Sequence, residues 1–157
     1  MTALDTTAPD LRLQLDALHA STCAWSLSLS RRVSAAMERY VLNGHAHGGE
    51  NFLEAGFVSL CRHSAIWKFD QFRQEVAERM HALKADPAVQ AARRLLGGRG
   101  PLHLDLGVGP DRYTALSNED WCRQTDTAFF HLMDCGNALQ LQAGELAAAA
   151  AAAQRIA

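Results

Sequence analysis

One apolar stripe with the period of a helix constrains this chain more than any other feature. Between residues 11 and 40, mostly apolar side chains recur at intervals of three and four residues: Leu11, Leu15, Leu18, Thr22, Trp25, Leu29, Val33, Ala36 and Tyr40. This spacing places them on one face of an α-helix and is close to the heptad of a coiled coil. Pro9 and Asp10 favour a helix start, and Asn43-Gly44 favours a stop. We therefore expect one long helix from about residue 10 to residue 42.

A second long helical pattern runs from Glu50 to about Ala85. It stops at Asp86 because the residue before a proline avoids the helical region. Asp86 and Pro87 then suit the N-cap and first position of a short third helix, which Gly97-Gly98 closes.

The last helix follows a capping box formed by Ser117 and Asp120. Seven alanines at residues 147–153 continue it, and alanine is the best helix former. We expect this tract to be a frayed helical tail, although its smooth surface would also let another helix approach closely. The apolar stripe of this helix comprises Trp121, Thr125, Ala128, Leu132, Cys135, Leu139, Gln142 and Leu146.

Composition agrees with these patterns. The chain has 28 alanines and 21 leucines against 6 valines and 2 isoleucines. Alanine and leucine favour helices, whereas β-branched residues favour strands. The sequence therefore predicts a mainly all-α fold.

The segment 97–118 lacks helical character because it is rich in glycine and proline. Its residues 102–108 alternate apolar and other side chains with period two, which indicates a short strand. Two interpretations stay open: a small hairpin-like loop near 99–116, or an extended loop that lies on the helices.

Together these elements predict an antiparallel bundle of three long helices, running up, down and up, with one short helix and the loop at one end. We expect a flexible N-terminus at 1–9, a single helical domain at 10–146 and an alanine-rich helical tail at 147–157. No secretory signal or membrane-spanning stretch is evident, so we expect a cytoplasmic protein.

A net charge of −2 argues against a protein that works mainly by binding nucleic acid. The four cysteines, Cys23, Cys61, Cys122 and Cys135, form no Cys-x-x-Cys pair and are expected to be reduced thiols. Nucleophile-elbow, phosphate-loop and dinucleotide motifs are missing too. These observations favour a role other than catalysis.

The histidines raise a rival interpretation. His45 and His47 alternate in a glycine-rich connector, and Glu50 follows closely. Imidazole and carboxylate groups at this spacing are able to ligate a divalent metal ion. A helical bundle that holds a metal or cofactor at His45, His47 and Glu50 is therefore the alternative to a protein without cofactors.

The second long helix carries two apolar faces. On a wheel at 100° per residue, with Phe52 at zero, Phe57, Leu60 and Trp67 fall at about 140°, 80° and 60°. The apolar residues of the second half, Phe69, Phe72, Val76, Met80 and Leu83, fall between about 200° and 280°. Either the helix breaks near His63-Ser64 and both pieces pack internally, or the first face binds a second chain.

We favour the second chain because large aromatic residues are typical of interface cores and no proline or glycine lies between Phe57 and Asp86. The sequence thus predicts a protein that acts by binding proteins, as an adaptor, chaperone-like factor or inhibitor, and that self-associates as a homodimer. The predicted partner-binding residues are Phe52, Phe57, Leu60 and Trp67.

Overall fold

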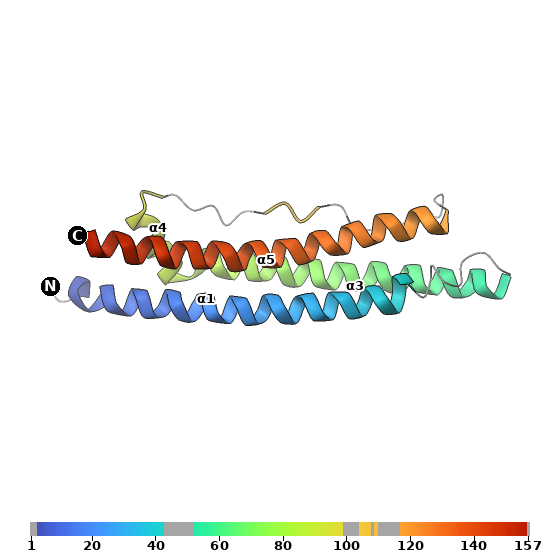
Figure 1. The fold of residues 1–157 in the computed structure, drawn as a ribbon, viewed down its shortest axis with the longest axis horizontal. Coiled ribbons are helices and arrows are strands. Elements are labelled where there is room, and N and C mark those ends of the chain that lie inside the picture. Colours follow the sequence, from blue (N-terminus) through green and yellow to red (C-terminus); the bar gives the residue numbers. More distant parts are fainter. Residues whose placement is uncertain (1–2, 43–51, 99–103, 108, 110–116, 157) are drawn as a thin grey trace. The chain divides into compact units, whose positions relative to one another are not determined.

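The computed structural model describes residues 3–42, 52–98, 104–107, 109 and 117–156. Helix α1 (Ala3–Ala36) continues into the π-helical η1 (Met37–Leu42), and α3 (Phe52–Ala85), α4 (Pro87–Leu95) and α5 (Asn118–Ile156) follow (Figure 1). Within these described ranges no residue belongs to a strand. The prediction of a mainly all-α fold is confirmed.

The ends of the first helix differ from the expected ones. Helix α1 begins at Ala3 rather than near Pro9, so Pro9 lies inside the helix and donates no hydrogen bond to the preceding turn. At the other end the helix widens into the π-turns of η1, which apolar periodicity alone does not indicate. Residues 43–51 lie outside the described part of the chain, and so do the predicted ligands His45, His47 and Glu50.

The predicted caps are present. The Asp86 carboxylate accepts a hydrogen bond of 2.8 Å from the Ala88 amide at the start of α4. Gly97 and Gly98, just past the end of α4, have positive φ angles of 69° and 80°, which glycine adopts without strain. The Ser117 hydroxyl accepts from the Asp120 amide at 3.2 Å, as in a capping box.

The chain divides into two compact units. Unit 1 comprises residues 1–27, 78–104 and 136–157, and unit 2 comprises residues 28–77 and 105–135. Each of the three long helices contributes a segment to both units. The expectation of one helical domain over 10–146 stays a prediction.

Aromatic rings from two helices form the centre of unit 2. The Phe129 ring of α5 meets Phe69 and Phe72 of α3 edge-on, with centroids 5.6 and 6.4 Å apart. Trp121 is 1% exposed, and the guanidinium of Arg62 lies 5.2 Å from its ring centre. Edge-to-face pairs of this kind add about 0.5–1.5 kcal/mol beyond the area that they bury.

These contacts also correct the direction predicted for the last helix. Within unit 2, Arg62 lies beside Trp121 and Phe69 beside Phe129, so α3 and α5 run in the same direction rather than opposite ones. The prediction assumed a short connection before α5. The chain instead has 22 residues between α4 and α5, and at about 3.3 Å per extended residue a segment of this length is long enough to span a long helix.

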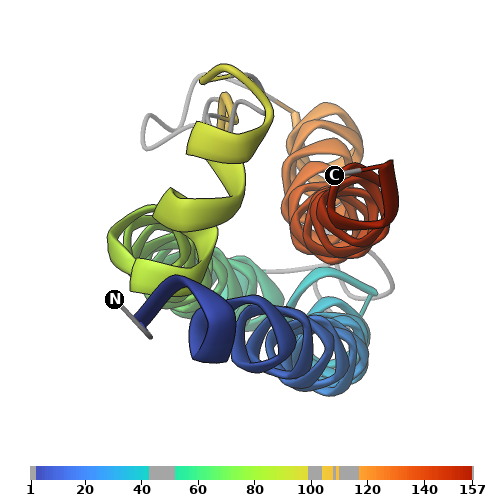
Figure 2. The ribbon, with the colours of Figure 1, turned by 90° about the vertical axis from the view of Figure 1, so that its left-hand side faces the viewer.

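Unit 1 contains the start of α1, the ends of α3 and α5, and α4; both chain termini belong to it (Figure 2). The Arg79 side chain crosses from α3 to α1, where it donates to the Ser21 carbonyl at 3.1 Å and lies 5.1 Å from the Trp25 ring centre. The alanine tract is helical as expected, and it is also packed, because Ala147 and Ala150 are buried.

The described residues of the connection, 104–107 and 109, form no strand. They lie on the helices, as the extended alternative proposed. In unit 1 the Leu104 amide donates to the Met80 sulfur at 3.4 Å. In unit 2 Asp105 and Gly107 contact His131 of α5. The other residues of the predicted hairpin lie outside the described residues.

Candidate partner-binding surface

Trp67 is the predicted partner-binding residue whose side chain the structure describes. Its side chain is 60% exposed on α3. Phe52, Phe57 and Leu60 belong to the same helix, but their side chains lie outside the described part. The structure therefore places one of the four residues at the surface and leaves the other three as predictions.

Helix α3 is continuous through His63-Ser64, so the expected alternative of a broken helix is wrong. Its second-half face is buried as predicted, with Phe69, Phe72, Val76, Met80 and Leu83 at most 6% exposed. A continuous helix keeps the angular relation of its residues. Trp67 consequently lies on a face turned away from the buried one.

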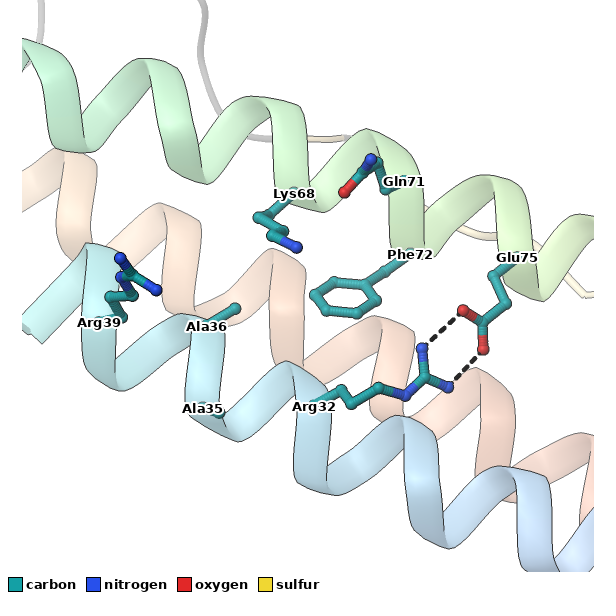
Figure 3. A pocket seen from close by; sticks show the side chains of 8 residues that line it. All are labelled: Arg32, Ala35, Ala36, Arg39, Lys68, Gln71, Phe72 and Glu75. Atoms are coloured by element: carbon teal, nitrogen blue, oxygen red, sulfur yellow. Dashed lines mark hydrogen bonds and ion pairs between the residues drawn. The ribbon is translucent and has the colours of Figure 1, made fainter.

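A groove lies in unit 2, between the end of α1 with η1 and the middle of α3 (Figure 3). It is a hollow of about 470 Å³. Its floor combines the short side chains of Ala35 and Ala36 with the ring of Phe72, which is 6% exposed. The described polar residues that line it are Arg32, Arg39, Lys68, Gln71 and Glu75.

An ion pair closes one end of the groove. The guanidinium of Arg32 on α1 donates two hydrogen bonds, of 2.7 and 2.6 Å, to the two carboxylate oxygens of Glu75 on α3. These bonds to Glu75 raise the pKa of Arg32, against the opposite effect of burial. The bidentate geometry fixes the two side chains relative to each other, and the same guanidinium lies 6.0 Å from the Phe72 ring centre.

Two cationic side chains lie at the other end of the groove. Figure 3 shows Arg39 and Lys68 there, on different helices, with the Phe72 ring between them and the ion pair. The Lys68 ammonium also lies 5.5 Å from the centre of the Trp67 ring, within the range of a cation–π contact. The described lining residues thus include three cations and one carboxylate, and the carboxylate is bonded to Arg32.

Sequence reasoning missed this groove. The lining residues of each helix recur at spacings of four and three, so each set is recognisable as one helix face. The two sets are Arg32, Ala36 and Arg39 on the first helix, and Lys68, Phe72 and Glu75 on the second. Spacing does not reveal that these two faces meet. That contact depends on the packing of α1 against α3.

A second hollow, of about 420 Å³, lies in unit 1 between α1 and α5. Arg12 and Asp16 carry opposite charges there, and the remaining lining is His19 with Gly144, Ala147, Ala148 and Ala151. A Cβ atom on Gly144 would lie 2.7 Å from His19 Nε2, so this glycine permits the close approach of the two helices. The described residues that line this hollow include no pair of a nucleophile and a base.

Sequence reasoning also missed a cluster on α5. His131 donates from Nε2 to the Asp105 carbonyl at 2.7 Å, and the Cys135 sulfur lies 3.5 Å from the same oxygen and 3.6 Å from Nε2. Burial raises the pKa of the Cys135 thiol, and the carboxylates of Asp134 and Asp105 add to this effect. A neutral thiol beside a histidine nitrogen that already donates is not an activated nucleophile. The cluster holds residue 105 against α5.

The structure describes the side chains of three of the four cysteines and none of the three predicted metal ligands. Cys23, Cys122 and Cys135 are free thiols, as predicted, and the side chain of Cys61 lies outside the described part. Among the described residues, no three or more histidine, cysteine, aspartate or glutamate side chains gather closely enough to hold a metal ion. The site at His45, His47 and Glu50 stays a prediction.

None of the described helices combines the length and the apolar character that crossing a membrane requires. A scan against protein-family models finds no matching family, and searches of curated proteins and of solved structures find no match.

Proposed function

We propose that this protein acts by binding other proteins, first of all a second copy of itself, through the α3 surface formed by Phe52, Phe57, Leu60 and Trp67. The observation that carries the proposal is an exposed tryptophan on an unbroken helix whose opposite face is already buried. Tryptophan buries on the order of 150–250 Å² in an interface core and is enriched at hot spots. An adaptor, a chaperone-like factor and an inhibitor, each acting in the cytoplasm, are roles that this surface suits.

A second copy of this chain is a suitable partner for a single apolar stripe on one helix. In a two-fold dimer the same patch serves both partners, so the stripe of one α3 covers the stripe of the other without any further surface. Because Trp67 is 60% exposed, about 90–150 Å² of its surface can still be buried, which at about 25 cal/mol per Å² contributes about 2–4 kcal/mol to association before the entropic cost.

Sedimentation velocity on the full chain tests this proposal. We expect a dimer for the wild type and a monomer for Trp67→Asp and Leu60→Asp, with circular dichroism still helical. Phe130→Asp is the matched control, because Phe130 is a 54% exposed aromatic residue of unit 2 on a different helix. It should leave the dimer intact.

Two results would overturn the proposal. One is a wild-type chain that stays monomeric at high concentration. The other is unfolding of Trp67→Asp, which would assign Trp67 to the core of the monomer.

A further inference from the structure

We propose that residues 105–107 and Gly109 form a strap over a thiol–imidazole pair on α5, Cys135 with His131, and that a small disulfide modifies Cys135 when the strap opens. Cys135 is then a redox-sensitive switch, because the modified sulfur keeps the strap open. All of these residues belong to unit 2, and the inference is independent of the proposed α3 surface.

The strap approaches two helices of unit 2 closely, because glycine lies at both contacts. A Cβ atom on Gly107 would lie 2.7 Å from His131 Cδ2 of α5, and one on Gly109 would lie 2.9 Å from Phe69 Cε1 of α3. The Gly107 amide also donates to the Asp105 carboxylate at 2.9 Å. Local contacts of this kind open at a lower free energy than the whole fold.

The closed strap keeps the thiol–imidazole pair inactive. The Asp105 carbonyl oxygen accepts a hydrogen bond from His131 Nε2 at 2.7 Å and lies 3.5 Å from Cys135 Sγ. Nε2 is only 3.6 Å from the same sulfur, but a nitrogen that carries and donates a proton does not accept one from the thiol. Cys135 is also 4% exposed, and burial together with nearby carboxylates raises the pKa of its thiol. The closed thiol is therefore both covered and protonated.

Opening the strap reverses both effects. His131 and Cys135 are four apart on one helix, so they stay neighbours when Asp105 leaves. Nε2 then has no carbonyl to donate to, and the tautomer with its proton on Nδ1 leaves Nε2 ready to take the thiol proton. A thiolate beside an imidazolium is the reactive form of cysteine. The same two residues thus become a nucleophile and its base.

The modification is a thiol–disulfide exchange. The Cys135 thiolate attacks one sulfur of the disulfide, a new S–S bond forms and the bond between the two reagent sulfurs breaks. The leaving sulfur takes that bonding electron pair and then the proton held by His131, so Cys135 is oxidised and the leaving thiol is reduced. The added sulfur lies about 2.05 Å from Sγ. The closed contacts of 3.5 and 3.6 Å leave no room for it on the strap side, so the strap stays open until a thiol reduces the bond.

Labelling of the full, reduced chain with 4,4′-dithiodipyridine, followed at each cysteine by peptide mass spectrometry, tests the inference. Gly107→Ala should speed the labelling of Cys135 relative to the half-buried Cys23 at least about tenfold, which corresponds to about 1.4 kcal/mol of strain in the closed strap. Gly97→Ala is the matched control, because Gly97 also has a positive φ angle but no described residue within 4 Å of its Cβ position. It should leave the ratio unchanged.

The dependence on urea separates opening of the strap from unfolding. In the wild type the labelling rate of Cys135 should hardly change with urea below the unfolding transition, because opening the strap exposes little surface. A rate that rises with urea as steeply as the unfolding equilibrium would overturn the inference, and so would a rate that Gly107→Ala does not increase.

The pH profile tests the role of His131. In the Gly107→Ala background, the labelling rate should have its midpoint at least about one pH unit below that of the chain that also carries His131→Gln, which should titrate like an ordinary thiol near pH 8.5. Equal midpoints would show that His131 does not act on the thiol.

Hydrogen exchange tests the switch itself. The Gly107 amide is hydrogen-bonded in the closed strap, so it should exchange faster once Cys135 carries the thiopyridyl group and regain its protection after reduction with dithiothreitol. A Gly107 amide that stays equally protected after labelling would show that the mixed disulfide does not hold the strap open.

Discussion

At the residue scale, two features of the structure favour glycine at position 107. Its φ angle is +76°, and a Cβ atom would lie 2.7 Å from His131 Cδ2. Its amide donates to the Asp105 carboxylate at 2.9 Å, so the turn is also fixed by a hydrogen bond. Together with the bond from His131 to the Asp105 carbonyl, this holds the connection against α5.

We predict that Gly107→Ala destabilises the protein more than Gly97→Ala. Gly97 has a similar φ angle of +69°, and no described residue lies within 4 Å of its Cβ position, so its substitution should cost backbone strain of about 1 kcal/mol. Gly107→Ala adds steric overlap with His131 and should cost a further ~1–3 kcal/mol. Urea unfolding of the two variants measures the difference; equal losses would contradict the contact with His131.

The second residue-scale prediction concerns Cys135. Burial and two carboxylates raise the pKa of this thiol in the folded chain. The folded thiol therefore stays neutral at pH values at which the same thiol of the unfolded chain is already ionised. Its contribution to the unfolding free energy is complete below the unfolded pKa of about 8.5 and is lost as the pH rises towards the folded pKa.

The stability difference between wild type and Cys135→Ala should therefore shrink from pH 8 to pH 10. The other titratable groups are the same in both chains, so their effect on the unfolding free energy cancels in this difference. Iodoacetamide should also alkylate Cys135 on the order of tenfold more slowly than the half-buried Cys23 at neutral pH. A pH-independent stability difference would show that the thiol is not protected in this way.

At the element scale, the continuity of α3 is the decisive feature, because an unbroken helix cannot turn both of its apolar faces towards the same core. Ser64→Pro tests this continuity. Proline would remove the hydrogen bond from residue 64 to the carbonyl of Leu60 and should cost about 3 kcal/mol in unfolding free energy. Ser64→Ala should change stability by less than ~0.5 kcal/mol. A proline variant that loses less than ~1 kcal/mol would indicate a helix already broken at this position.

At the scale of the whole molecule, self-association couples stability to concentration. A folded dimer that unfolds to monomers gains about 1.4 kcal/mol for each tenfold rise in protein concentration. We predict that the thermal midpoint of the wild type rises with concentration and that the midpoint of Trp67→Asp does not. Differential scanning calorimetry over a hundredfold range of concentration measures both. A wild-type midpoint that is independent of concentration would argue against the dimer.

Local patterns determined which segments are helical. The three-and-four spacing of apolar residues predicted the long helices, Asp86-Pro87 predicted the cap of α4, and Ser117 predicted the start of α5. The face of α3 that includes Phe69 and Phe72 was predicted to be apolar and is buried. These features depend on neighbours within about one helical turn, so the sequence contains them directly.

Tertiary structure alone decided how these helices meet. The direction of α5, the hydrogen bond from His131 to Asp105, and the groove between Arg32 and Lys68 all join residues far apart in the chain. Each helix offers more than one face on which packing is feasible, and the long connection at 96–117 permits either direction of α5. The choice is made by the combined burial and fit of all the side chains at once, such as the close contact of Gly144 with His19, which no local spacing encodes.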